Sequence, residues 1–354
     1  MGTSESRATA SPDDLAVTAE RCAAQLLCGD QADSPEEVAR RLLAIQAQDP
    51  RGARLAVRAR SAGLSASDVG SALTRRSLIV TWLNRGTLHL VRSEDYWWLH
   101  PLTTPQLRTG NSRRLAQEGV PPEDAERAVA TVQAALAADG PLTRSQLRER
   151  VAAAGVRTDG QAMVHILALA SIRGLIVRGP VAGRDQAFVL ARDWLGTPPP
   201  GMSREAALGE LARRYLAGHA PAADRDLAQW AGIGLADARL GLARCGAIPR
   251  ADRLAELPSN PQRAAAALPP PRLLGAFEPL LLGWASRDPI VGAHRRIVTA
   301  GGLFRPFALA GGRAVATWNI AGGQVVLAPF APLDTQTQAA LAADAAAVMR
   351  FLGQ

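Results

Sequence analysis

The feature that most constrains the fold is a group of helices followed by a β-hairpin, which the N-terminal part of the chain predicts. Ser34-Pro35-Glu36-Glu37 predicts a helix start, because serine caps a first turn and proline suits its first position. Apolar residues at helical spacing follow, and Pro50 ends this helix near Asp49. We expect further helices over residues 51–62 and 67–76, then strands over 78–82 and 87–91 joined by the turn Asn84-Arg85-Gly86. This order is typical of a winged helix, and we assign the first unit to residues 14–110.

The same order recurs twice along the chain. The second unit, residues 122–195, has expected helices over 123–139, 143–154 and 160–173, then strands over 175–178 and 187–190. The third unit, residues 203–257, has expected helices over 203–217, 225–231 and 235–244, the last being the candidate recognition helix. A breaker, Gly140-Pro141 or Ala220-Pro221, precedes the second helix of each unit. We interpret this as a repeated helix-turn-helix architecture.

The rest of the chain has a different pattern. Residues 273–354 contain short apolar runs separated by glycine pairs, which predicts a β-rich module, closed by an amphipathic helix over 335–352. Residues 1–13 are expected to be a flexible lead, and the Pro/Ala-rich residues 258–271 a linker. The expected fold class is α+β, mainly α, with three tandem winged-helix units and a β-rich C-terminal module.

Charge indicates a polyanionic partner. The 354-residue chain has a formal net charge of +8, and all 40 of its basic residues are arginine. A basic soluble protein favours nucleic acid before membrane. The absence of lysine excludes lysine Schiff-base chemistry and a Walker lysine. Neither a membrane-spanning run nor a secretory pattern is present, so we expect a cytoplasmic, nucleoid-associated protein.

Metal and cofactor chemistry are not expected. Cys22, Cys28 and Cys245 have neither zinc nor iron–sulfur spacing, and an odd number of cysteines favours buried thiols. The five histidines form no H-x-x-x-H pair. We therefore predict no metal and no cofactor.

Gln46-Ala47-Gln48 is the candidate catalytic motif. It lies where the capped helix breaks, and in an extended exit both glutamine side chains point to one side. A neutral amide offers donors and an acceptor, so the pair can hold a water molecule. The alternative is that both are solvated polar residues at a helix end.

Arginines near this motif are candidate DNA contacts. Arg51, Arg54 and Arg58 form a stripe on the following helix that suits phosphates, and Arg85 is expected at the tip of the wing. The alternatives are a solvated helix face and simple turn chemistry. The tryptophans Trp82, Trp97 and Trp98 are expected in the core rather than in a base-stacking platform.

Four ordered motifs resemble the winged-helix, AlkZ-like family of bacterial DNA glycosylases, over about residues 14–352. They are Gln46-Ala47-Gln48-Asp49-Pro50, the segment from Trp82 through Arg85 and His89 to Val91, the segment from Leu273 to Trp284, and the segment from Gly312 to Trp318. The resemblance implies three tandem winged helices and catalysis by a Gln-x-Gln signature, matched here by Gln46 and Gln48. A sister branch has Gln-x-Asp. Glu278 departs from the family pattern, in which aspartate is expected.

The resemblance also implies the activity: removal of N-alkylated purines such as N7-alkylguanine, and unhooking of interstrand crosslinks, in DNA repair or in self-resistance to a genotoxic natural product. Asp49 or Glu278 is a possible assisting carboxylate, and His89 joins the arginines as an expected DNA contact. Without lysine the enzyme is expected to be monofunctional, releasing the base by base excision without strand cleavage. The expected partner is alkylated or crosslinked double-stranded DNA, bound by a monomer. The alternatives are a non-enzymatic winged-helix DNA-binding protein such as a transcription regulator, which reads half-sites as a dimer, and a partner-binding scaffold.

Overall fold

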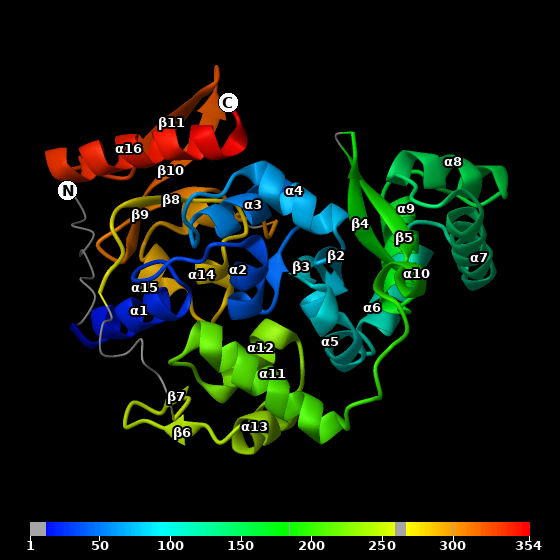
Figure 1. The fold of residues 1–354 in the computed structure, drawn as a ribbon, viewed down its shortest axis with the longest axis horizontal. Helices are drawn as coiled ribbons and strands as arrows, with labels where there is room; N and C mark the ends of the chain where they lie inside the picture. The colour runs from blue at the N-terminus through cyan, green and yellow to red at the C-terminus, as the bar shows by residue number, and fades with distance from the viewer. Residues whose placement is uncertain (1–11, 184, 259–266, 300) are drawn as a thin grey trace, which may run out of the picture.

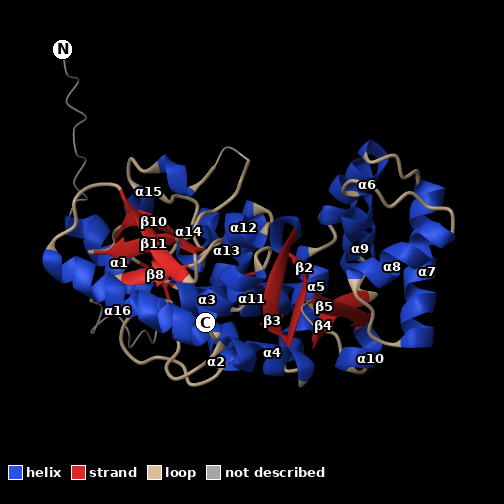
Figure 2. Cartoon of the chain, turned by 90° about the horizontal axis from the view of Figure 1, so that it is seen from above, coloured by secondary structure: helices blue, strands red, loops and turns tan. Residues whose placement is uncertain are grey.

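The computed structural model describes residues 12–183, 185–258, 267–299 and 301–354. The chain is an α+β structure in which helices surround antiparallel sheets (Figures 1 and 2). We divide it into four segments: segment 1 (residues 12–103), segment 2 (107–195), segment 3 (204–256) and segment 4 (272–352). In Figure 1, segment 1 lies between segment 2 on the right, segment 3 below and segment 4 at the upper left.

In each of the first two segments, a β-hairpin follows a group of helices. Segment 1 contains α1 (Pro12–Ala24), α2 (Pro35–Leu42), β1 (Ile45–Gln46), α3 (Pro50–Arg58), α4 (Ala66–Thr74), β2 (Leu78–Leu83), the 3-10 turn η1 (Asn84–Gly86), β3 (Thr87–Arg92), η2 (Ser93–Asp95) and α5 (Tyr96–Thr103). Segment 2 contains α6 (Leu107–Gln117), α7 (Pro122–Asp139), α8 (Arg144–Ala153), α9 (Ala162–Ile172), β4 (Ile176–Ala182), β5 (Asp185–Leu190) and α10 (Ala191–Leu195).

The last two segments complete the chain. Segment 3 contains α11 (Arg204–His219), α12 (Asp224–Ala231), α13 (Leu235–Arg244), β6 (Ile248–Pro249) and β7 (Ala255–Glu256). Segment 4 contains β8 (Arg272–Leu274), α14 (Pro279–Leu282), α15 (Asp288–Val291), η4 (Arg295–Ile297), β9 (Phe307–Ala310), β10 (Arg313–Ala321), β11 (Gln324–Pro329) and α16 (Thr335–Leu352). A four-stranded sheet, β11-β10-β9-β8, lies where the sequence analysis expects short strands.

Most helices occur where the sequence predicts them, because their start signals are local. Ser34 accepts a hydrogen bond from the Glu37 amide at the start of α2, and Thr143 forms the expected capping box with Gln146. The flexible lead expected over residues 1–13 is wrong at its end. Helix α1 begins at Pro12, with Asp13 and Asp14 in the first turn, where carboxylates interact favourably with the helix dipole. The rest of that lead, and part of the expected 258–271 linker, lie outside the described residues.

Segments 1 and 2 share one sheet and one core. The five-stranded sheet has the order β1-β3-β2-β4-β5, with Val80 of β2 opposite Arg178 of β4. On one face of this sheet, Val80, Leu90 and Phe188 belong to one continuous core that includes residues of α2, α7 and α9. The two hairpins are therefore edge-paired parts of one layer, so neither segment has a separate hydrophobic interior.

The opposite face of this sheet packs on segment 3. Ile79, Val91 and Val177 point to this face and join a second core with Tyr215 of α11 and Leu227 of α12. Alternate strand residues face opposite sides of a sheet, so the two cores lie on either side of the same strands. A third core joins α16 to the sheet of segment 4 and reaches Leu55 of α3.

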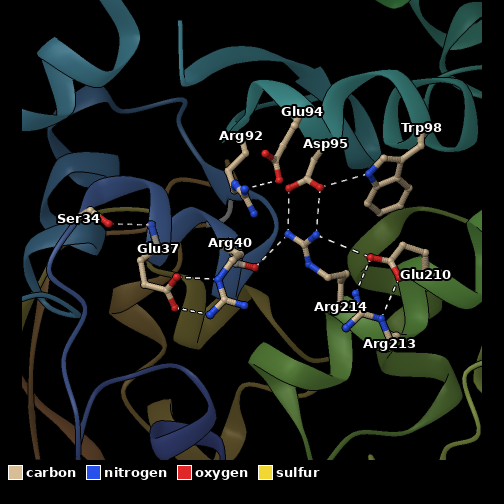
Figure 3. Close-up of polar contacts among 10 residues, drawn as sticks. All are labelled: Ser34, Glu37, Arg40, Arg92, Glu94, Asp95, Trp98, Glu210, Arg213 and Arg214. Atoms are coloured by element: carbon tan, nitrogen blue, oxygen red, sulfur yellow. Dashed lines mark hydrogen bonds and ion pairs between the residues drawn. The ribbon is translucent and has the colours of Figure 1, made fainter. Parts of the chain in front are cut away.

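A buried ion pair fixes α11 against segment 1. Arg214 donates to both carboxylate oxygens of Asp95, at 3.0 and 2.9 Å, and to the carbonyl oxygen of Arg40 at 3.1 Å (Figure 3). Trp98 donates to the same carboxylate at 3.2 Å. Both charged side chains are nearly inaccessible to solvent. This bidentate geometry sets the orientation of segment 3 as well as its position.

No described helix is long and apolar enough to cross a membrane.

Three buried histidines predict a loss of stability in mild acid. Burial lowers the pKa of His89 and His219 to about 3 and that of His100 to about 4. Between these values and the ordinary value near 6.5, the unfolded chain binds more protons than the folded one. Stability from these groups is therefore full above pH ~6.5 and falls as the pH drops, by about 2 kcal/mol for each histidine at pH 5.

Urea unfolding at pH 7.5 and pH 5.0 checks this prediction. We expect a lower midpoint at pH 5.0, with the slope of the transition unchanged. Carboxylates titrate mainly below pH 5, so the interval isolates the histidines. Equal midpoints at the two pH values would contradict it.

Candidate active site

The two glutamines of the candidate motif touch each other. Gln46 is the last residue of β1, opposite His89 of β3, and its side chain is buried, with 6% of the residue exposed. Gln48 is exposed, two residues further along the extended chain. Nε2 of Gln46 donates to Oε1 of Gln48 at 2.6 Å. The expectation that both side chains point to one side is confirmed, and only Gln48 of the two is exposed.

Helix α3 begins directly after the pair. Asp49 caps it, since its Oδ1 accepts the Arg51 amide at 2.9 Å, and Pro50 is the first helical residue. Gly52 packs directly on segment 4, because a Cβ there would overlap the carbonyl oxygen of Ala276. The first turn of α3, and with it the backbone next to Gln48, is thus held between β1 and segment 4.

Arg85 does not lie at an exposed wing tip. The η1 turn packs against the C-terminal end of α12, and a Cβ on Gly232 would overlap the Arg85 backbone. The guanidinium donates to the carbonyl oxygens of Gln229, at 3.3 Å, and Trp230, and its Nη2 donates to Oε1 of Gln46 at 3.3 Å. Burial lowers the pKa of Arg85 to about 10, so the group is still a cation at neutral pH. The expected DNA contact by Arg85 is therefore corrected: segment 3 covers the turn.

The three side chains form a hydrogen-bond chain with one direction. A guanidinium only donates, so the amide oxygen of Gln46 must face Arg85. Its amide nitrogen then faces Gln48 and donates to Oε1. Gln48 is left with its NH₂ group and one oxygen lone pair toward solvent. The chain thus presents one oriented neutral amide at the surface.

His89 and Glu278 lie too deep for the roles expected from the sequence. His89 is buried, its Nδ1 lies 3.0 Å from the Thr87 carbonyl oxygen, and its low pKa keeps the ring neutral. With 2% of its surface exposed, His89 lies beneath the protein surface, so the expected DNA contact is corrected. Glu278 has no exposed side-chain surface; it caps α14 and pairs with Arg60 at 2.5 Å. Glu278 is therefore part of the core, and Asp49 is the expected assisting carboxylate that remains near the surface.

The arginine stripe on α3 is divided. Arg51 is exposed, and Arg54 is half-buried on the wall of a cavity. Arg58 pairs with Asp344 of α16, with Nη1–Oδ2 at 3.0 Å, and is nearly inaccessible. Arg58 is thus corrected from a phosphate contact to a link with segment 4, because α16 lies where solvent was expected.

Arg144, Arg148 and Arg178 were not singled out from the sequence, although they gather around that same cavity beside Arg54. Arginines are spread along the whole chain, so no local signal distinguished them. Their grouping depends on the pairing of β2 with β4, which brings segment 2 against α3 and α4.

A DNA-repair enzyme class is indicated by the comparisons with known proteins. Residues 39–351 match the model of the AlkZ-like DNA glycosylases, which covers most of the chain, and the chain belongs to this family. It is 29% identical over 352 residues to the interstrand DNA cross-link repair glycosylase of Streptomyces sahachiroi, covering 90% of this chain and 91% of that protein. This chain is also similar to the solved structure of Streptomyces sahachiroi DNA glycosylase AlkZ, with a TM-score of 0.77 and 26% sequence identity. The match covers 96% of each of the two chains.

The buried pair of Glu278 and Arg60 predicts a structural phenotype. Glu278→Ala leaves an uncompensated buried guanidinium, so we expect a loss of about 3–5 kcal/mol of stability. Glu278→Gln keeps an acceptor for Arg60 and is expected to lose less. The control Glu126→Ala removes an exposed pair with Arg173 and is expected to lose no more than about 1 kcal/mol.

Urea unfolding and base release by the folded fraction measure these effects together. A Glu278→Ala variant of unchanged stability that no longer releases a base would assign Glu278 to the chemistry instead.

Proposed function

We propose that this protein is a monofunctional DNA glycosylase that hydrolyses the N-glycosidic bond of N-alkylated purines, N7-alkylguanine among them. Membership of the AlkZ-like family supports the reaction class. The name of the Streptomyces relative, an interstrand DNA cross-link repair glycosylase, supports crosslinks as substrates. Repair of alkylated DNA, including self-resistance to a genotoxin, is the corresponding role.

The observation that carries the proposal is the directed chain from Arg85 through Gln46 to Gln48. An N7-alkylguanine is already cationic and needs little acid help to leave. What the enzyme supplies is a positioned water and an environment for an oxocarbenium-like sugar. The exposed Gln48 amide has a donor and an acceptor for that water, and the Asp49 carboxylate beside it offers negative charge to the sugar.

DNA binding is assigned to three winged-helix units. Each of segments 1, 2 and 3 has a helix, a short strand or bridge, two helices and a hairpin, in the order of a winged helix. The bridges Leu142–Phe188 and Ala222–Ala255 are the counterparts of β1 in segments 2 and 3. Because the units lie in one chain, we propose a monomer that follows a single duplex, with Arg51 and Arg54 on its phosphates.

A non-enzymatic DNA-binding protein is the second candidate. It shares the net charge of +8 and the proposed winged helices. A non-enzymatic DNA-binding function does not explain why the hydrogen-bond chain from Arg85 through Gln46 ends in an exposed Gln48 amide. Release of a base distinguishes the two.

Single-turnover release of 7-methylguanine tests the glutamine pair. Gln46→Ala and Gln48→Ala are each expected to slow release by roughly tenfold to a thousandfold, because a positioned hydrogen-bonding group is lost. Gln48→Asp is expected to stay active, since Gln46 donates and a carboxylate still accepts. Gln48→Ala should leave stability unchanged, whereas Gln46→Ala also removes a buried partner of Arg85.

Gln336→Ala, at an exposed position of α16, is the matched control and is expected to keep the wild-type rate. The product should be an intact abasic strand, since the chain has no lysine for a lyase step. Two alanine variants at the wild-type rate would remove the pair from the mechanism. A wild type that binds DNA but releases no alkylated base would favour the second candidate.

Arg85 is proposed as a positioning residue. Without the Arg85 donor, the Gln46 amide is free to flip, and Gln48 then loses its fixed orientation. Arg85→Ala is therefore expected to slow release of a methylated base by about tenfold, as for loss of a positioned group, at unchanged DNA affinity. Bulky lesions should be affected equally.

A double-mutant cycle isolates this effect. If Arg85 acts through Gln46, the Arg85→Ala/Gln46→Ala double variant releases the base no more slowly than Gln46→Ala alone. Arg85→Lys, which keeps a cationic donor, should recover part of the rate. A loss of DNA affinity at an unchanged rate would instead return Arg85 to the DNA interface.

A further inference from the structure

A cavity of about 570 Å³ lies between segments 1 and 2. Its floor is the shared sheet, with Leu90 of β3, Val80 of β2 and Phe188 of β5. Helices α3 and α4 form one wall, and α8 and α9 the other. The volume is within the range of small-molecule sites and has an apolar floor with polar groups around it.

Cations dominate the polar part of this cavity. Arg54, Arg144, Arg148 and Arg178 line it, against one acidic residue, Asp185. Within the described residues only Arg148 of these has an ion pair, with the exposed Asp159 at 3.0 Å. A group of largely unpaired guanidiniums calls for an anion.

Arg178 is the deepest of the four. Its guanidinium carbon lies 4.9 Å from the ring centre of Phe188 and 5.2 Å from that of Trp82. Its Nε is buried and has no hydrogen-bond partner in the described structure. Burial, and then the charge of Arg144, lower its pKa to about 10. The guanidinium therefore covers both rings and has one buried donor that lacks an acceptor.

The cavity and the glutamine pair lie on opposite faces of the sheet. Ala47 lines the cavity, while Gln46 points to α12 through Arg85. A cationic alkylated purine would also be repelled by the arginines. The occupant is therefore an anionic, unmodified part of the same DNA and not the lesion base.

We propose that this cavity binds one unmodified nucleotide of the DNA strand, with its phosphate on the arginines and its base on the apolar floor. This inference rests on the proposed function as a DNA glycosylase. It adds a place on the protein where the DNA strand is bound.

Calorimetric titration with thymidine 3′,5′-bisphosphate, compared with inorganic phosphate, tests the site. We expect the nucleotide to bind at least about tenfold tighter than phosphate, because its base adds contact with the apolar lining of the cavity, Val164 and Val181 among it. Arg144→Gln, at an exposed position, and Val164→Trp, which fills the cavity, should each weaken the nucleotide about tenfold. Arg150→Gln is the matched control, because Arg150 lies on the same helix but pairs with Asp139.

Duplex binding provides the second readout. Arg144→Gln should weaken affinity uniformly and reduce the salt slope by about one, whereas the control Arg150→Gln should leave the affinity and the salt slope close to the wild-type values. Nucleotide binding no tighter than phosphate, or unaffected by both cavity variants, would overturn the proposal. A wild type that binds the nucleotide but releases no base would overturn the proposed function and leave this site standing.

Discussion

The ion pair between Arg60 and Glu278 is the interaction on which the rest of the arrangement depends. Both side chains are fully inaccessible, and Gln25, directly after α1, accepts from the same guanidinium at 2.6 Å. Arg60 follows the C-terminal end of α3, while the other end of that helix begins beside Gln48. Gly52 and Arg58 add contacts to segment 4 along the same helix. The C-terminal module therefore sets the direction of α3, and through it the position of the exposed glutamine.

Much of the local structure follows from the sequence. Caps, breakers and apolar spacing predict α13 and α16 at their observed bounds and α3, α4, α7, α8, α9, α11 and α12 to within a few residues, because these signals act over one or two turns. The expected end of α2 near Asp49 is wrong, since the helix ends at Leu42 and β1 follows, and α5, α6, α10, α14 and α15 were not predicted. The sequence does not predict the pairing of β2 with β4, which joins two hairpins into one sheet. Edge pairing depends on which strand edges meet in space, and neither hairpin encodes its partner. Helix α1 was missed because its first turn resembles a polar lead.

The same distinction applies to the candidate site. An extended exit from a helix is a local property, so the common direction of Gln46 and Gln48 is predictable. The positions of Arg85 and Glu278 are not, because each is decided by a segment far along the chain. Segment 3 covers the turn that carries Arg85, and Arg60 lies 218 residues before Glu278. Residue type alone therefore predicted the wrong surroundings for Arg85 and for Glu278.

Charge separation across the sheet connects these observations. On the glutamine face the Arg85 cation is held by two carbonyl oxygens at the C-terminal end of α12, where the helix dipole is negative. The hydrogen-bond chain from Arg85 thus ends at the surface in a neutral amide, which suits a leaving group that is itself a cation. Arg54, Arg144 and Arg178, for which the described structure shows no ion pair, lie around the cavity on the other face. Attraction for phosphate and tolerance of positive charge at the sugar conflict if they share one surface, and the extended segment from Ile45 to Gln48 lies between the arginines of the cavity and the Gln48 amide.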